Sequence, residues 1–199
     1  MPDFLRGSWS KARTVVKYLK ANITMFNKNK IISIVNKSEN EIKSPILSMI
    51  ARQMDKWTKG EEYILRHNIN PQLIPTALPH VALVERLNEC NKRFYIRLAG
   101  EEITNRTLGF TAKIFIEDVT PEFYSTSMIE QYGLAIDDGA VQIQDIIWNY
   151  DFRVLHIERF LVPVIFKDVS KPDGLLIATV RAEDTLEYMV DNPKFDSDK

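Results

Sequence analysis

The chain has 199 residues, of which 45% are hydrophobic and 27% are charged, as in an ordinary globular domain with its own core. The formal net charge of -1 excludes a general electrostatic attraction to nucleic acid or to an anionic membrane. No apolar run approaches the roughly 20 residues needed to cross a bilayer, and the first residues lack the basic start and apolar centre of a secretory signal. We therefore expect a cytoplasmic protein.

The first 43 residues form a basic extension, with nine lysine and arginine residues against three acids. Between residues 8 and 27 the apolar residues recur at spacings of three and four, which is the stripe of an amphipathic helix. The stripe consists of Trp9, Ala12, Val16, Leu19, Ile23 and Phe26. Such a helix packs on its own domain or on a second copy of the chain, lies on an anionic membrane, or binds an acidic partner.

A second helix is predicted over about residues 45–66. Ser44 and Pro45 have the character of an N-cap followed by proline at the first helical position. Apolar residues then continue at helical spacing, namely Leu47, Ile50, Met54 and Trp57. Three prolines between residues 71 and 79 exclude a long helix there and favour short turns.

From Val81 onward the apolar period changes to two, which predicts β-strands. The predicted strands cover residues 81–87, 93–98, 141–149, 154–166 and 175–182. The first two should form an antiparallel hairpin. Helical segments follow, of which the clearest covers residues 121–136, before the last three strands. A polar tail occupies residues 186–199.

Local sequence along this pattern resembles a bacterial single-domain subfamily of the PAS family. Residues 70–83 (NPQLIPTALPHVAL) resemble its opening motif, residues 93–100 (RFYIRLAG) its second strand, and residues 157–164 (IERFLVPV) a later strand. Residues 108–113 (LGFTAK) are similar to its glycine turn, although Ala112 stands where the family has the final glycine. The motifs occur in the family's order, and the resemblance covers about residues 47–182.

The resemblance implies an α+β fold with a five-stranded antiparallel sheet of order 2-1-5-4-3 and helices on one face, here preceded by two N-terminal helices. The PAS-like domain would cover residues 44–185, after the helical extension 1–43. The resemblance implies a sensory or regulatory role without catalysis, and it transfers no particular ligand. Because PAS domains often dimerise through N-terminal helices, it favours self-association over membrane contact, and we expect no nucleic-acid partner.

Two arginines are candidate ligand-binding residues, because each lies inside an otherwise apolar strand. Arg97 and Arg159 need partners if they are buried. The simpler partner is an internal acid, such as Glu85, Glu102 or Glu158. The functional partner is an anionic ligand, which arginine binds through two parallel hydrogen bonds.

Three aromatic residues complete the candidate site: Tyr124, Tyr132 and Trp148. They either line a cavity beneath the helices or belong to the plain core. No cofactor is indicated. The predicted helix 121–136 has no histidine to bind haem. Cys90, the only cysteine, lies in a predicted turn, whereas flavin-binding light sensors carry theirs on a helix.

Metal and catalytic motifs are missing from the sequence. His67, His80 and His156 form none of the short zinc-binding patterns, and there is no nucleotide loop or serine elbow. The alternative to a regulator is a small-molecule enzyme with a cone-shaped α+β fold, in which Asp145 acts as a general base in an apolar pocket. A third possibility is an adaptor with a filled core.

Overall fold

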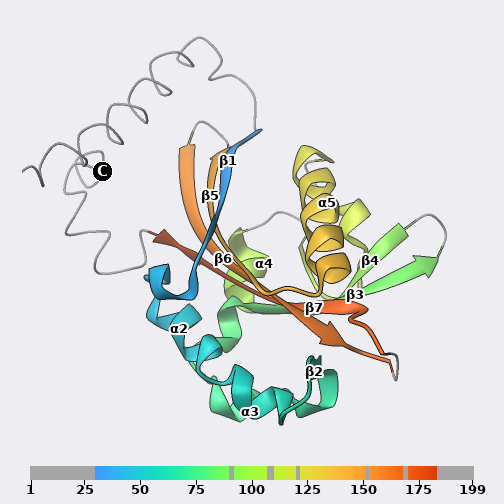
Figure 1. Ribbon diagram of the computed structural model, residues 1–199. Coiled ribbons are helices and arrows are strands. Elements are labelled where there is room, and N and C mark those ends of the chain that lie inside the picture. Colours follow the sequence, from blue (N-terminus) through green and yellow to red (C-terminus); the bar gives the residue numbers. More distant parts are fainter. Residues whose placement is uncertain are drawn as a thin grey trace, which may run out of the picture.

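A computed structural model describes residues 30–89, 92–106, 110–119, 122–150, 153–167 and 170–182. In these segments helices pack on both faces of a mostly antiparallel sheet (Figure 1), which confirms the α+β class. Over the described residues the sheet has seven strands where five were expected. The predicted helix over residues 8–27 and the tail over residues 186–199 lie outside the described residues. Both therefore stay predictions.

The sheet has the strand order β1-β5-β6-β7-β3-β4. Its long strands are β1 (Lys30–Lys37), β3 (Val81–Glu89), β4 (Lys92–Ala99), β5 (Gln142–Tyr150), β6 (Arg153–Ile165) and β7 (Gly174–Arg181). The short β2 (Ile64–Leu65) joins β6 in parallel. All five predicted strands are present as β3 to β7, with ends that differ from the expected ones by one or two residues. Alternation of apolar residues in β4 and continuous apolar runs in β6 and β7 were therefore sufficient signals for these strands.

Strand β1 departs from the expectation of a helical extension over residues 1–43. It pairs antiparallel with β5, from Lys30 opposite Asn149 to Lys37 opposite Ile143. The β-branched run in its sequence, KIISIVNK, suits a strand better than a helix. The end of the basic extension is therefore an edge of the sheet.

The single helix predicted over residues 45–66 is wrong in extent, because the structure divides this segment. Helix α2 (Pro45–Ala51) is followed by α3 (Met54–Thr58). Lys59 and Gly60 after α3 have positive φ angles of 53° and 87°, the left-handed backbone that ends a helix. The predicted N-cap is confirmed, since the Ser44 side chain accepts a hydrogen bond from the backbone N–H of Leu47.

The remaining helices are short, with one exception. They are η3 (Glu39–Glu41), η4 (Arg66–Asn68), η5 (Pro71–Leu73), η6 (Leu78–His80), α4 (Glu101–Arg106) and η7 (Ile116–Asp118). The turns η5 and η6 confirm the effect expected of the three prolines. The exception is α5 (Glu122–Asp138), which confirms the predicted helix over residues 121–136.

Neighbouring residues of the central strands pack into different core clusters. On β6, Phe160 packs in the cluster of α2 and α3, whereas Leu161 packs in the cluster of α5. This alternation follows from the two-residue period of a strand. The helices α2 and α3 therefore cover one face of the sheet and α5 covers the other (Figure 1).

Candidate functional site

A small cavity lies between α5 and the face of the sheet formed by β5, β6 and β7. The space open to the centres of water molecules is about 40 Å³, and one water needs roughly 10–15 Å³ of such space. Its walls are mainly aromatic and aliphatic, with Ser127, Thr179, Arg159 and Arg181 among the polar residues. A concave, mostly apolar space with a few polar groups is typical of a small-molecule site.

The structure brings four of the five candidate residues together at this cavity: Tyr124, Tyr132, Trp148 and Arg159. The rings of Tyr124 and Trp148 stack, with centroids 4.4 Å apart and an angle of 6° between their planes. Tyr132 is only 2% exposed, and burial raises the pKa of its hydroxyl well above the ordinary value. Tyr132 therefore stays neutral at any physiological pH.

Arg159 is one of two arginines in the cavity wall, beside Arg181, and it is buried with 5% exposure. Its Nε and Nη2 groups both donate to Oε1 of Gln144, at 3.0 and 2.5 Å. The guanidinium carbon lies 5.5 Å from the centroid of the Tyr132 ring. Among the described residues no carboxylate pairs with Arg159, so the expected internal acid is not found there and a neutral amide takes its place.

Gln144 is held in this orientation by a second layer of amides. Its Nε2 group donates to Oε1 of Gln131 on α5 at 3.2 Å and to Oε1 of Gln142 on β5 at 3.0 Å. Since the amide nitrogen is engaged on that side, the amide oxygen is left to face Arg159. Gln144 was not predicted from the sequence, although a polar residue at a core-facing position of a strand was a usable signal.

Arg97 lies away from the cavity and is not buried, which corrects its placement in the candidate site. Its side chain is 45% exposed on β4 and pairs with Glu85 at 2.5 Å. Glu85 also contacts Lys167 Nζ at 3.1 Å. The expected internal acid is thus confirmed for Arg97. The reason for its exposure is that β4 is an outer strand of the sheet.

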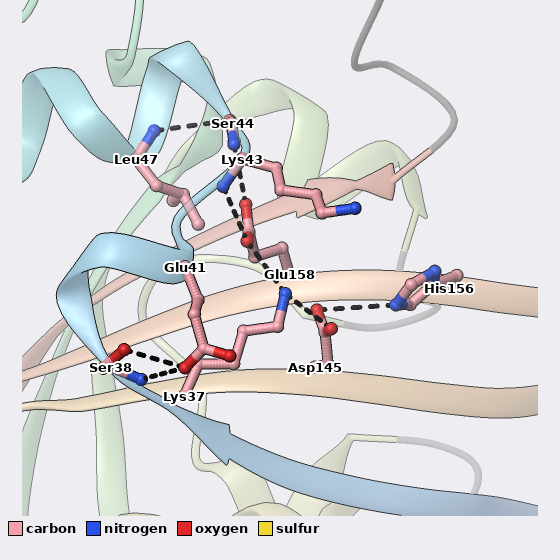
Figure 2. Close-up of polar contacts among 9 residues, drawn as sticks. All are labelled: Lys37, Ser38, Glu41, Lys43, Ser44, Leu47, Asp145, His156 and Glu158. Carbon is pink, nitrogen blue, oxygen red and sulfur yellow. Dashed lines mark hydrogen bonds and ion pairs between the residues drawn. The ribbon is translucent and has the colours of Figure 1, made fainter. Parts of the chain in front are cut away.

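A polar cluster lies on the opposite face of the sheet, where β1, β5 and β6 meet (Figure 2). Lys37 Nζ contacts Asp145 at 2.5 Å and Glu158 at 3.4 Å. His156 Nε2 lies 3.4 Å from the other oxygen of Asp145. The cluster therefore ties the edge strand β1 to the two strands beside it.

Glu158 also fixes the start of helix α2. Its Oε2 accepts a hydrogen bond from the backbone N–H of Ser44 at 2.9 Å, and its Oε1 accepts one from Lys43 at 3.1 Å. Glu158 is 2% exposed, and a carboxylate at this position is favoured by the unpaired N–H groups of a helix start. One buried side chain thus holds the connection between β1 and α2 against the sheet (Figure 2).

The contacts of the cluster shift the pKa values of two members. Burial alone would raise the pKa of Asp145, but its contacts with His156 and Lys37 hold that pKa below the ordinary value. Burial alone would lower the pKa of Lys37, but the contacts with Asp145 and Glu158 hold it above the ordinary value. Both groups are therefore charged near neutral pH.

The placement of Asp145 contradicts its proposed role as a general base in an apolar pocket. Its carboxylate lies in the ion-pair cluster, and Asp145 is not among the residues that line the cavity. A base in an apolar pocket needs a raised pKa, whereas that of Asp145 is lowered. The two-residue period of β5 explains the difference, since Gln144 and Ile146 face the cavity side.

The described residues hold neither a metal-binding cluster nor a helix able to cross a membrane. No group of three or more histidine, cysteine, aspartate or glutamate side chains has the arrangement of a metal site there. Across the same segments, every helix is too short or too polar to cross a bilayer.

Comparison with known proteins does not extend this description. Neither a scan against protein-family models nor searches of curated proteins and of solved structures gave a match for the chain. The site must therefore be interpreted from its own geometry.

Proposed function

We propose that the chain is a cytoplasmic PAS-type regulatory domain that binds a small molecule in the cavity under α5. The observation that carries the proposal is the strand order. Numbering only the five predicted strands, the order β4-β3-β7-β6-β5 is 2-1-5-4-3. Helices α4 and α5 lie between the second and third of these strands, as the resemblance to PAS domains implies, and the cavity is beneath α5.

The polar cluster supports a regulatory role, because it holds the connection between β1 and α2 on the face of the sheet opposite the cavity. Arg159 lines the cavity, and its neighbour Glu158 binds the connection between β1 and α2. A ligand shifts an equilibrium only through different affinities for two states. Here the two states would differ in how this connection packs on the sheet.

We propose that the output is self-association through the predicted helix over residues 8–27. In the full chain, Leu19→Glu interrupts the apolar stripe of that helix and should convert a dimer into a monomer in analytical ultracentrifugation. A truncation used for the same purpose must keep Lys30–Lys37, because this segment is a strand of the sheet. Sedimentation of the full chain with anionic liposomes would instead favour the membrane interpretation.

Native mass spectrometry of the purified full chain tests the proposal for the cavity. We expect a retained small molecule that is lost in Thr179→Leu, because Thr179 lines the cavity and leucine fills part of it. The matched control is Thr76→Leu, at an exposed position outside the cavity lining, which should keep the extra mass. Equal retention by all three proteins, or none by any of them, would contradict binding in this cavity.

A further inference from the structure

The charge of Arg159 is not balanced by any group that contacts it in the described residues. Its hydrogen-bond acceptor Gln144 is a neutral amide, and the ring of Tyr132 beside it belongs to a neutral phenol. A buried cation without an anionic partner is costly, and proteins normally supply one. As far as the structure describes the chain, the cavity wall therefore contains a guanidinium that has no anionic contact.

The two acids beside Arg159 on β5 and β6 are engaged on the other face of the sheet. Glu158 precedes Arg159 on β6 and binds Lys37, Lys43 and Ser44. Its cross-strand partner Asp145 binds Lys37 and His156. Because side chains alternate along a strand, neither carboxylate reaches Arg159 without a change in register.

The cavity is too small for a large anion. Its space of about 40 Å³ corresponds to roughly three water molecules, at about 10–15 Å³ each. Apart from a few polar groups its walls are apolar, including Met128, Ile146 and the stacked pair of Tyr124 and Trp148. An occupant that suits both features has one anionic group and a short hydrocarbon part.

We propose that the cavity binds a compact monocarboxylate, with the carboxylate on Arg159 and the hydrocarbon part against the apolar wall. This inference rests on the proposed small-molecule function of the cavity and names the chemical class of the ligand. Gln144 occupies the Nε and Nη2 edge of the Arg159 guanidinium, and a planar carboxylate matches the remaining edge formed by the two Nη groups. Inorganic phosphate also binds arginine, but it has no hydrocarbon part to contact the aromatic stack.

The test measures thermal unfolding of the full chain with sodium propionate, propionamide or sodium phosphate, with sodium chloride added to equal ionic strength. Propionamide has nearly the same shape as propionate but no charge. Propionate should raise the unfolding midpoint by roughly 5 °C or more at saturation, and the other two should not. Nuclear magnetic resonance of the Arg159 Nε–H group should show a shift that saturates with propionate alone.

Two conservative variants separate the role of Arg159 from a general effect of arginine. Arg159→Lys keeps the charge but loses the planar fork, so the dissociation constant for propionate should rise about tenfold or more. Arg97→Lys makes the same change outside the cavity, beside Glu85, and should leave that constant unchanged. If Arg159→Lys does not fold, the comparison of propionate with propionamide on the unmodified chain still decides.

Each remaining outcome overturns the inference in a distinguishable way. Equal stabilisation by propionate and propionamide would mean that the cavity binds small molecules without selecting charge, so the carboxylate assignment fails while the proposed function stands. Stabilisation by phosphate as strong as by propionate would identify a general anion site. An unchanged unfolding midpoint and an unchanged Arg159 resonance with all three compounds would overturn the carboxylate assignment. Whether the purified chain retains a small molecule in native mass spectrometry would then decide the proposed function separately.

Discussion

Glu158 and Arg159 are adjacent on β6, and their side chains serve opposite faces of the sheet. Arg159 lines the cavity under α5, and Glu158 accepts backbone hydrogen bonds from Lys43 and Ser44 at the start of α2. A single peptide unit therefore joins the candidate ligand site to the N-terminal connection. A movement of β6 at the cavity would therefore displace the Glu158 carboxylate that binds this connection.

The first prediction concerns Glu158→Gln. The amide replaces the carboxylate oxygens by one acceptor and one donor, so one buried N–H of the connection loses its acceptor and Lys37 loses one anion. We expect a loss of about 1–3 kcal/mol in the free energy of unfolding, measured by chemical denaturation. Hydrogen exchange at the Ser44 amide should also become faster.

The control for this variant is Asp137→Asn, which breaks an exposed ion pair with Arg86. The side chain of Asp137 is 65% exposed, and an exposed pair contributes at most about 1 kcal/mol. If Glu158→Gln costs no more than this control and leaves exchange at Ser44 unchanged, Glu158 does not hold the connection.

The second prediction is a pH dependence that originates at Asp145. Its pKa is lower in the folded chain than the ordinary value, which is about 3.9 for an unfolded aspartate. In the folded chain Asp145 therefore binds a proton less readily than in the unfolded chain. Its contribution to the free energy of unfolding is present above about pH 4 and is lost as the pH falls through the lowered pKa. Asp145→Asn should have a lower free energy of unfolding than the unmodified chain at pH 7. Below pH 4 its free energy of unfolding should decrease less steeply with falling pH.

Measuring the free energy of unfolding of both proteins between pH 7 and pH 3 isolates this contribution, because the other carboxylates are common to both. The difference between the two curves should shrink as the pH falls. A difference that stays constant over the whole range would mean that the folded chain does not lower the pKa of Asp145.

The sequence predicted the strands well because alternation is a local property. Lys92–Ala99 shows it, with Phe94 and Ile96 buried, while Gly174–Arg181 is largely a run of apolar residues, which is an equally local signal. The end of α3, well before the predicted residue 66, depends on the left-handed backbone at Lys59 and Gly60. Of these two residues only the glycine is a recognisable helix-ending signal in the sequence. Strand β1 was missed because its β-branched run lies within a basic extension whose apolar stripe dominated the interpretation.

The candidate site was less predictable, because it depends on register. Arg97 and Arg159 look alike in sequence, as single arginines among apolar residues. The structure gives Arg97 an acid on the neighbouring β3 and solvent on one side, whereas Arg159 has Gln144 directly opposite on β5. Which residue faces an arginine across a sheet is set by strand pairing, and a single sequence does not display that pairing.

The third prediction tests whether Arg97 and Glu85 act as a structural pair. Glu85 is 3% exposed, and removing Arg97 leaves its buried charge with Lys167 alone. We expect Arg97→Leu to cost about 2–3 kcal/mol in unfolding free energy, and Arg97→Leu combined with Glu85→Leu to cost less than the sum of the two single changes. A double-mutant cycle measured by chemical denaturation should give a coupling of about 1–3 kcal/mol. Additive effects would show that the pair contributes nothing to stability.

The fourth prediction compares two glycines with opposite surroundings. Gly100 ends the second-strand motif, and its N–H donates to Val81 O at 2.8 Å. A Cβ at Gly100 would collide with the carbonyl oxygens of Leu78 and Pro79, so Gly100→Ala should cost about 2 kcal/mol or more, as overpacking does.

Gly133 is the matched control, because it lies inside α5 and a Cβ there meets no atom within 4 Å. Alanine is the better helix former, so Gly133→Ala should raise the free energy of unfolding by about 0.5–1 kcal/mol. Both variants exchange one hydrogen for a methyl group, and chemical denaturation of each should give opposite signs. A gain in stability from Gly100→Ala would mean that the close approach between η6 and the end of β4 does not exist in solution, whereas a loss from Gly133→Ala would contradict the open space beside Gly133.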